Sequence, residues 1–184
     1  MSSGPLKILL VGTSKARKSA IASFLAGVAE IVGDGVGPTI GVRILECERA
    51  GRAVEIWDVS GDQAFEGTWP AVQKDADGVL LLFDPEGAGQ ARELELWHEW
   101  FVQKTGLPVE RAAIWAVTPA PYLGGLPSIA DGTSVESFSV DTAESMRRAF
   151  DRFVSRVAGE SAGGAGMRRP AGNVGRGGSA VLRN

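Results

Sequence analysis

The segment that most restricts the fold lies near the start of the chain, where an apolar run passes through a short basic loop into a helical pattern. LKILLVG (6–12) is a continuous apolar run ended by glycine, which is typical of a buried strand. Residues 19–32 repeat apolar side chains at helical spacing, which predicts an amphipathic helix. A buried strand that leads through a loop into a helix is typical of a parallel sheet covered by helices.

The rest of the chain continues this alternation. The pattern predicts a hairpin made of strands 42–47 and 53–59, which are joined by a turn at 50–52. It also predicts three further strands, 77–84, 111–118 and 136–140, and two further helices, 91–101 and 141–157. Asp141 is expected to cap the last helix, with Glu144 completing a capping box. The predicted class is therefore α/β, with a mostly parallel six-stranded sheet, one antiparallel edge strand and helices on both faces.

Length and composition favour one soluble domain with a tail. The chain has 184 residues and 44% hydrophobic residues, and no apolar run approaches the roughly 20 residues that cross a bilayer. Residues 1–157 carry the periodic patterns, whereas 158–184 are rich in Gly, Ala and Arg without periodicity and are expected to be disordered. The net charge of −3 is the sum of −6 on residues 1–157 and +3 on residues 158–184, and an acidic body argues against nucleic acid as a partner.

The loop after the first strand resembles a phosphate-binding loop with one substitution. In GTSKARKS (12–19), Gly12, Lys18 and Ser19 match the pattern G-x-x-x-x-G-K-[ST], but Arg17 replaces the second glycine. Arg17 is expected to adopt a helical φ and still offer its N–H. Backbone N–H groups and the helix N-terminus would then surround phosphate oxygens, with contacts from Gly12, Thr13, Ser14, Lys15, Ala16, Arg17, Lys18, Ser19 and Ala20.

A second element supports nucleotide binding. WDVSGD (57–62) ends a predicted strand and matches D-x-x-G, where Asp58 would hold the Mg²⁺ shell through water and the Gly61 N–H would contact the γ-phosphate. Between the two elements, Thr39 in PTIGV offers a second hydroxyl. We therefore expect Ser19 and Thr39 to be the direct protein ligands of Mg²⁺.

The order of these motifs resembles the small GTPases of the Rab type. TIGV, WDxxG and DADGVLLLFD correspond to the two switches and the strand that follows. GPTIGVRILE, FEGTWPAVQKDADGV and ELELWHEWFVQ are more similar to one divergent branch, the Rab-like protein 5 type, which are subunits of intraflagellar transport complex B. The resemblance covers about residues 6–157.

That resemblance implies specific properties. It implies the P-loop small-GTPase fold, GTP or GDP with Mg²⁺ as ligands, and coiled-coil subunits of the transport complex as partners. It also implies a location in the cilium or flagellum and in the cytoplasm near the basal body. The chain ends in VLRN, and residue 2 is serine, so we expect no lipid anchor.

Two departures from the Rab pattern concern chemistry and base recognition. Asp62 stands where a glutamine orients the attacking water, and a carboxylate there repels the γ-phosphate, so hydrolysis is expected to be slow or absent. Thr118 matches the start of the guanine-reading element, but Pro119-Ala120-Pro121 follow in place of its lysine and aspartate. Guanine selectivity is therefore open at this point.

The residues around the switches suggest a docking surface. We expect Ile40, Val42, Phe65 and Trp69 to contact a partner, with Trp69 as an aromatic anchor or, equally, as simple core. His98, the single histidine, is expected on the surface.

Three functions remain open from sequence. The favoured one is a GTP-binding adaptor of the transport complex that is kept in one state. The others are an active small GTPase or another P-loop enzyme, and a pseudo-GTPase scaffold that needs no nucleotide.

Overall fold

The computed structural model describes residues 4–13, 15–33, 37–129 and 131–159. Strands and helices alternate along the chain, as β1 (Leu6–Gly12), α1 (Lys18–Leu25), β2 (Val42–Arg49), β3 (Arg52–Val59), α2 (Trp69–Gln73), β4 (Gly78–Phe83), α3 (Gln90–His98), β5 (Ala112–Thr118), β6 (Ser134–Ser139) and α4 (Ala143–Val157). Short 3₁₀ turns precede α2, β5 and α4, at Gln63–Thr68, Val109–Arg111 and Val140–Thr142. A π-helical turn, Glu99–Gln103, extends α3.

The strands form one six-stranded sheet in the order β2-β3-β1-β4-β5-β6. Only the β2–β3 pair is antiparallel, and the other four pairs are parallel. Ala50 and Gly51 form the two-residue turn of this hairpin, both with positive φ (50° and 70°), as the twist of a tight hairpin requires. The predicted mixed sheet with an antiparallel edge strand is confirmed.

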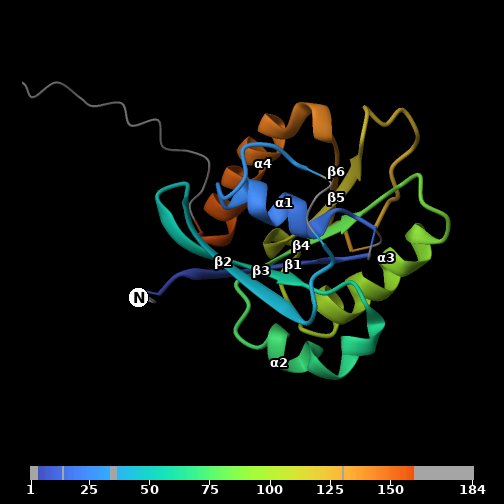
Figure 1. Ribbon diagram of the computed structural model, residues 1–184. Helices are drawn as coiled ribbons and strands as arrows, with labels where there is room; N and C mark the ends of the chain where they lie inside the picture. Colours follow the sequence, from blue (N-terminus) through green and yellow to red (C-terminus); the bar gives the residue numbers. More distant parts are fainter. Residues whose placement is uncertain (1–3, 14, 34–36, 130, 160–184) are drawn as a thin grey trace, which may run out of the picture.

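Helices cover both faces of the sheet (Figure 1). On one face, α1 and α4 pack over the even-numbered side chains of β1, and Phe24, Phe150 and Trp115 are buried there. On the other face, α2, α3 and the π-helical turn pack over Leu9 and Val11. Since alternate residues of a strand point to opposite faces, a strand covered on both sides is almost entirely apolar, as β1, β4 and β5 are apart from Lys7 and Thr118.

Two helix boundaries differ from the sequence prediction. α1 ends at Leu25 rather than continuing to 32, and Val28 and Ile31 are 69% and 74% exposed. Asp141 does not cap α4, because a 3₁₀ turn occupies 140–142 and the helix begins at Ala143. The expected capping box is therefore wrong.

The last helix ends near the point where the domain boundary was predicted. α4 ends at Val157, and its terminal carbonyls accept hydrogen bonds from the backbone of Ala158 and Gly159. The predicted disordered tail lies outside the described residues from 160 onward, so it stays a prediction. Within the part of the chain that is described, no helix is long and apolar enough to cross a bilayer.

Candidate nucleotide site

The loop between β1 and α1 begins with a glycine that no other residue could replace. Gly12 has a φ of 131°, and a Cβ there would lie 1.9 Å from the carbonyl oxygen of Leu82 on β4. The next residue, Thr13, is buried, and its N–H donates to the same Leu82 carbonyl at 3.3 Å. Its hydroxyl donates to the buried side-chain amide of Gln90 at the start of α3. The loop is thus anchored to two neighbouring elements before it turns toward the site.

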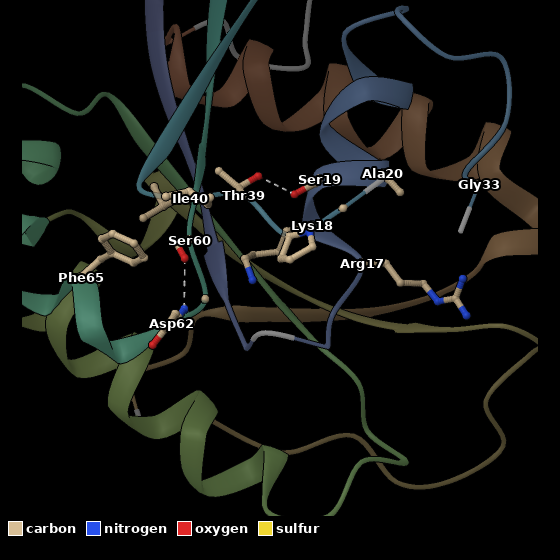
Figure 2. A pocket seen from close by; sticks show the side chains of 14 residues that line it. Arg17, Lys18, Ser19, Ala20, Gly33, Thr39, Ile40, Ser60, Asp62 and Phe65 are labelled. Carbon is tan, nitrogen blue, oxygen red and sulfur yellow. Dashed lines mark hydrogen bonds between the residues drawn. The ribbon is translucent and has the colours of Figure 1, made fainter. Parts of the chain in front are cut away.

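Arg17 takes the place of the second glycine of the pattern and also its conformation. Its φ of 55° and ψ of 25° are left-handed, so the expected helical φ is wrong. Figure 2 shows the Arg17 side chain extending away from Ser19 and Thr39, so the cation does not lie across that part of the site. A non-glycine residue in this conformation costs about 1 kcal/mol.

We expect the free energy of unfolding of Arg17→Gly to exceed that of Arg17→Ala by about 1 kcal/mol, because glycine adopts a positive φ without steric cost. Arg17→Ala is the matched control, because it removes the same side chain but keeps the Cβ and the strain. Chemical denaturation of both variants measures the difference. Equal stability of the two would show that the left-handed backbone carries no strain.

Lys18 and Ala16 point inward from the loop. Ala16 is buried in the core beneath it, and Lys18 is only 6% exposed. The Lys18 ammonium donates to the carbonyl of Thr13 at 2.6 Å, across the mouth of the loop. Burial lowers the pKa of Lys18 from its ordinary 10.5 to about 8, although the charges of Asp58 and Glu93 oppose the shift. A desolvated cation inside a loop of backbone N–H groups is a strong attractor for a polyphosphate.

The three residues proposed for Mg²⁺ meet beside Lys18. The Thr39 hydroxyl donates to Asp58 Oδ2 at 2.7 Å, and the Ser19 hydroxyl lies 2.7 Å from the same Thr39 oxygen. Because the Thr39 hydroxyl already donates its proton to Asp58, the Ser19 hydroxyl is the donor in its bond with Thr39. Figure 2 shows Ser19 and Thr39 pointing toward one another across the site.

This donor set fits Mg²⁺. The Asp58 carboxylate is fully buried, and its Oδ1 has no hydrogen-bond partner within the described residues. An unsatisfied buried carboxylate oxygen has a large desolvation cost, which a hydrated cation would offset. Mg²⁺ prefers hard oxygen ligands and keeps several waters, so two hydroxyls and one carboxylate suffice alongside phosphates. Among the described residues, no cluster of three or more His, Cys, Asp or Glu side chains suggests another metal.

A cavity of about 520 Å³ opens onto Lys18, Ser19 and Thr39, and Asp58 lies behind Thr39 without lining it. Its wall combines the loop, the segment after α1, the segment before β2 and the segment after β3, with Arg17, Lys18, Ser19, Ala20, Gly33, Gly37, Pro38, Thr39, Ile40, Val59, Ser60, Gly61, Asp62 and Phe65. The predicted residues Gly61 and Asp62 therefore line the same space as Lys18. Of the predicted loop, Lys15 is exposed and outside this lining, and Ser14 lies outside the described residues.

Asp62 is exposed and already has a local hydrogen bond. Its carboxylate accepts from the Ala64 N–H at 2.9 Å and so caps the 3₁₀ turn, while its own N–H donates to the Ser60 hydroxyl at 3.2 Å. Asp62 lines the cavity, and Figure 2 shows its hydrogen bond with Ser60 there. A carboxylate at this position carries a negative charge and has no N–H to donate, so it does not suit a group that orients an attacking water.

Thr118 lies at the carboxyl end of β5, where a base-reading element is expected. It is buried, and its hydroxyl donates to the carbonyl of Ala120 at 2.6 Å. The hydroxyl therefore stabilises its own loop, and residues 119–121 contain no carboxylate. Thr118 remains a candidate only through its position.

Arg43 is a site residue that the sequence analysis missed. From β2, one guanidinium nitrogen donates to the Ser19 carbonyl at 2.8 Å and to the Ser23 hydroxyl at 3.1 Å, and it lies 3.2 Å from Asp58 Oδ2. The sequence signal is that Arg43 alternates with the apolar Val42 and Ile44, so its side chain lies on the opposite, α1 side of the sheet.

The structure corrects the expected partner surface. Trp69 is fully buried and packs against Trp97, Trp100 and Phe101, so its role as an exposed anchor is wrong. Ile40 is 84% exposed, whereas Val42 and Phe65 are half-buried.

Two further residues extend that surface along the hairpin. Ile44, which is 48% exposed, pairs across the strands with the half-buried Trp57, beside the Val42–Val59 pair. We call Ile40, Val42, Ile44, Trp57 and Phe65 the switch face.

His98 is also not where the sequence placed it. It is buried at the end of α3, and its Nε2 lies 3.0 Å from Asp131 Oδ2 and 3.2 Å from the Thr133 hydroxyl. It fixes the loop that leads into β6 and is remote from the lining of the cavity.

Comparison with known proteins finds relatives that are intraflagellar transport proteins. No protein-family model matches the chain. The chain is 34% identical over 173 residues to the intraflagellar transport protein 22 homolog of Danio rerio, covering 83% of this chain and 89% of that protein. It is 36% identical over 116 residues to intraflagellar transport protein 22 of Trypanosoma brucei brucei, covering 55% of this chain and 53% of that one.

Solved structures show the same architecture. The GTP-bound crystal structure of T. brucei IFT22/74/81 contains a chain that matches with a TM-score of 0.72 and 29% identity, covering 85% of this chain and 96% of that one. A GDP-bound T. brucei IFT22 structure matches with a TM-score of 0.62 and 28% identity, covering 84% and 95%. The predicted small-GTPase fold is confirmed.

Proposed function

Because the chain belongs to the intraflagellar transport protein 22 family, we propose that it is a GTP-binding adaptor subunit of intraflagellar transport complex B. Its ligands are GTP or GDP with Mg²⁺, and it acts in assembly of the cilium or flagellum. It resides there and in the cytoplasm near the basal body. The T. brucei relative was crystallised with GTP and together with IFT74/81, which supports both parts of the proposal.

One observation carries the nucleotide assignment. The buried Lys18 ammonium, the Ser19 and Thr39 hydroxyls and the unpartnered Asp58 Oδ1 belong to one site although they come from three separate segments of the chain. In a scaffold without ligand, the desolvation of Lys18 and Asp58 would lower the stability of the fold, and no ligand contact would offset this cost. Lys18 would contact the phosphates, and Ser19, Thr39 and Asp58 would hold the metal that neutralises them.

Slow hydrolysis follows from the residue at the water-orienting position. The Asp62 carboxylate caps a 3₁₀ turn and carries a negative charge at the rim of the site. It cannot donate a hydrogen bond to the γ-phosphate, and its charge opposes the negative charge of the transition state. We propose that the protein retains GTP rather than cycling rapidly, which suits an adaptor.

The switch face is the proposed docking surface for the coiled-coil subunits. Ile40 adjoins Thr39, and Phe65 follows Asp62, so the apolar surface begins where the nucleotide site ends. An apolar surface rimmed by charged residues is a common protein interface.

We expect Ile40→Asp and Ile44→Asp each to weaken binding to the chain's own counterparts of IFT74/81 by at least about tenfold, because each buries a charge in the interface. Val28→Asp and Ile31→Asp are matched controls, since these residues are similarly exposed but lie beyond the end of α1. Size-exclusion chromatography and titration calorimetry with the purified pair measure the effect. Full binding by both switch-face variants would place the partner elsewhere.

A further inference from the structure

Arg43 connects three elements of the nucleotide site. It starts on the edge strand β2, contacts the Ser19 carbonyl and the Ser23 hydroxyl of α1, and forms an ion pair with Asp58 at the end of β3. The Asp58 side chain is fully buried, and that of Arg43 is 36% exposed. The pair is therefore partly desolvated, and the arginine is the counter-charge of a carboxylate placed to hold the Mg²⁺ shell.

The two oxygens of the Asp58 carboxylate have different surroundings. Asp58 Oδ2 accepts a hydrogen bond from the Thr39 hydroxyl at 2.7 Å and lies 3.2 Å from the Arg43 guanidinium in an ion pair. Asp58 Oδ1 and Arg43 Nε are buried and have no partner within the described residues. The Thr39 hydroxyl and the Arg43 guanidinium therefore both engage one oxygen of the carboxylate, and the other oxygen is left for a ligand.

We propose that Arg43 is a positioning residue that competes with Mg²⁺ for the negative charge of Asp58 and so weakens the affinity of the site for the metal. This inference rests on the proposed nucleotide function. A fixed cation bound to the carboxylate that holds the metal shell repels a divalent cation beside it, and partial burial limits screening by solvent. The same residue also stabilises the fold, because it joins β2 to α1.

These two roles predict effects of opposite sign. A residue that is only structural would lower stability and metal affinity together when it is replaced. A competing cation lowers stability on removal but raises metal affinity, because the repulsion is lost. The comparison of the two readouts therefore separates the alternatives.

The test measures the release of a fluorescent GDP from the full chain over a series of free Mg²⁺ concentrations set with EDTA. The Mg²⁺ midpoint is the free Mg²⁺ concentration at which the release rate lies halfway between its values without Mg²⁺ and at saturating Mg²⁺. We expect this midpoint to be about fivefold to tenfold lower for Arg43→Gln than for the wild type. Arg43→Lys keeps the charge, and its midpoint should stay within about twofold of the wild type. Thermal unfolding of the nucleotide-free proteins is recorded in parallel, and both variants should melt at a lower temperature.

Arg49→Met is the matched control on the same strand. Arg49 forms an ion pair with Asp151 on α4 at 2.8 Å, away from the cavity. Its loss should lower the unfolding temperature without moving the Mg²⁺ midpoint.

An unchanged or higher midpoint for Arg43→Gln would overturn the inference, because Arg43 would then be structural only. If Arg43→Gln does not fold, a midpoint for Arg43→Lys more than about twofold from the wild type would overturn it equally. Wild-type nucleotide release that ignores Mg²⁺ altogether would instead contradict the proposed function.

Discussion

Lys18→Met should lower the affinity for GTP and GDP by at least about a hundredfold and, at the same time, stabilise the nucleotide-free protein by about 2 kcal/mol at pH 7. The affinity falls because the buried ammonium is the cation placed to meet the phosphates. The stability rises because the folded chain no longer desolvates a charge. Methionine fills a similar volume without a buried charge.

The pKa of Lys18 gives the pH dependence of this gain. The folded-state pKa is about 8, below the ordinary 10.5, so the unfolded chain binds more protons between these two values. The free energy of unfolding of the wild type should therefore rise with pH across this window. Below pH 8 Lys18 is charged in the folded protein, so its burial lowers the free energy of unfolding by the full amount. The difference between Lys18→Met and the wild type should shrink as the pH rises from 8 toward 10.

Fluorescent-nucleotide titration and urea denaturation at pH 7 and pH 9 measure both effects. Lys15→Met is the control, because Lys15 belongs to the same loop but is exposed. Its loss should change stability by less than about 0.5 kcal/mol. A Lys18→Met protein that binds nucleotide normally, or that is less stable than the wild type, would contradict the assignment.

Trp69→Ala should destabilise the protein by about 3–5 kcal/mol, the typical cost of deleting a large aromatic side chain from a core. The indole is fully buried, and its ring centroid lies 4.7 Å from that of Trp97 and 5.3 Å from that of Phe101. The void left by the missing indole would weaken the packing of α2 against α3 and so would disturb the switch face indirectly. Chemical denaturation followed by the remaining tryptophans gives the change in free energy.

Trp69→Phe distinguishes packing from hydrogen bonding. The Trp69 Nε1 is buried and has no partner among the described residues, so its removal sacrifices no bond. We expect Trp69→Phe to cost clearly less than Trp69→Ala and to retain partner binding. Nearly wild-type stability of Trp69→Ala combined with lost partner binding would restore the interface role that the structure contradicts.

The fold and the centre of the site were accessible from the sequence because local pattern and burial agree there. β1, β4 and β5 are buried on both faces, so their apolar runs admit few other interpretations. The convergence of Lys18, Ser19 and Asp58 could be inferred because the parallel strands β1 and β3 bring their carboxyl ends to one edge of the sheet. Thr39 joins them because it precedes β2, which runs antiparallel to β3 and therefore starts at the same edge. The resemblance to Rab-like subunits of the transport complex, made on short motifs, is confirmed by the family.

The residues that sequence analysis misplaced depend on tertiary contacts. Arg43 looks like a solvent-facing residue of an edge strand until Ser19 and Asp58 are placed beside it. The sequence around Trp69 is compatible with a buried tryptophan and with an exposed one, so it cannot distinguish core packing from a partner contact. His98 is buried because Asp131, distant in sequence, supplies its partner.

Backbone conformation was equally hidden. The left-handed φ of Arg17 is imposed by the loop as a whole, against the intrinsic preference of the residue. Val28 and Ile31 keep helical spacing, but α1 ends at Leu25 and leaves them exposed. Periodicity predicts which face of a helix is apolar and not where the helix ends.

The proposed function requires that this chain hold a guanine nucleotide with Mg²⁺ through the site around Lys18. The most direct measurement is titration of nucleotide-free protein with fluorescent GTP, GDP and ATP, with and without Mg²⁺, followed by chromatography of the nucleotide recovered from the purified protein. We expect saturable, Mg²⁺-dependent binding of GTP and GDP in preference to ATP, with bound GTP recovered largely intact. Absence of binding by the folded wild-type protein would contradict the proposed function and leave a scaffold that uses the fold without nucleotide.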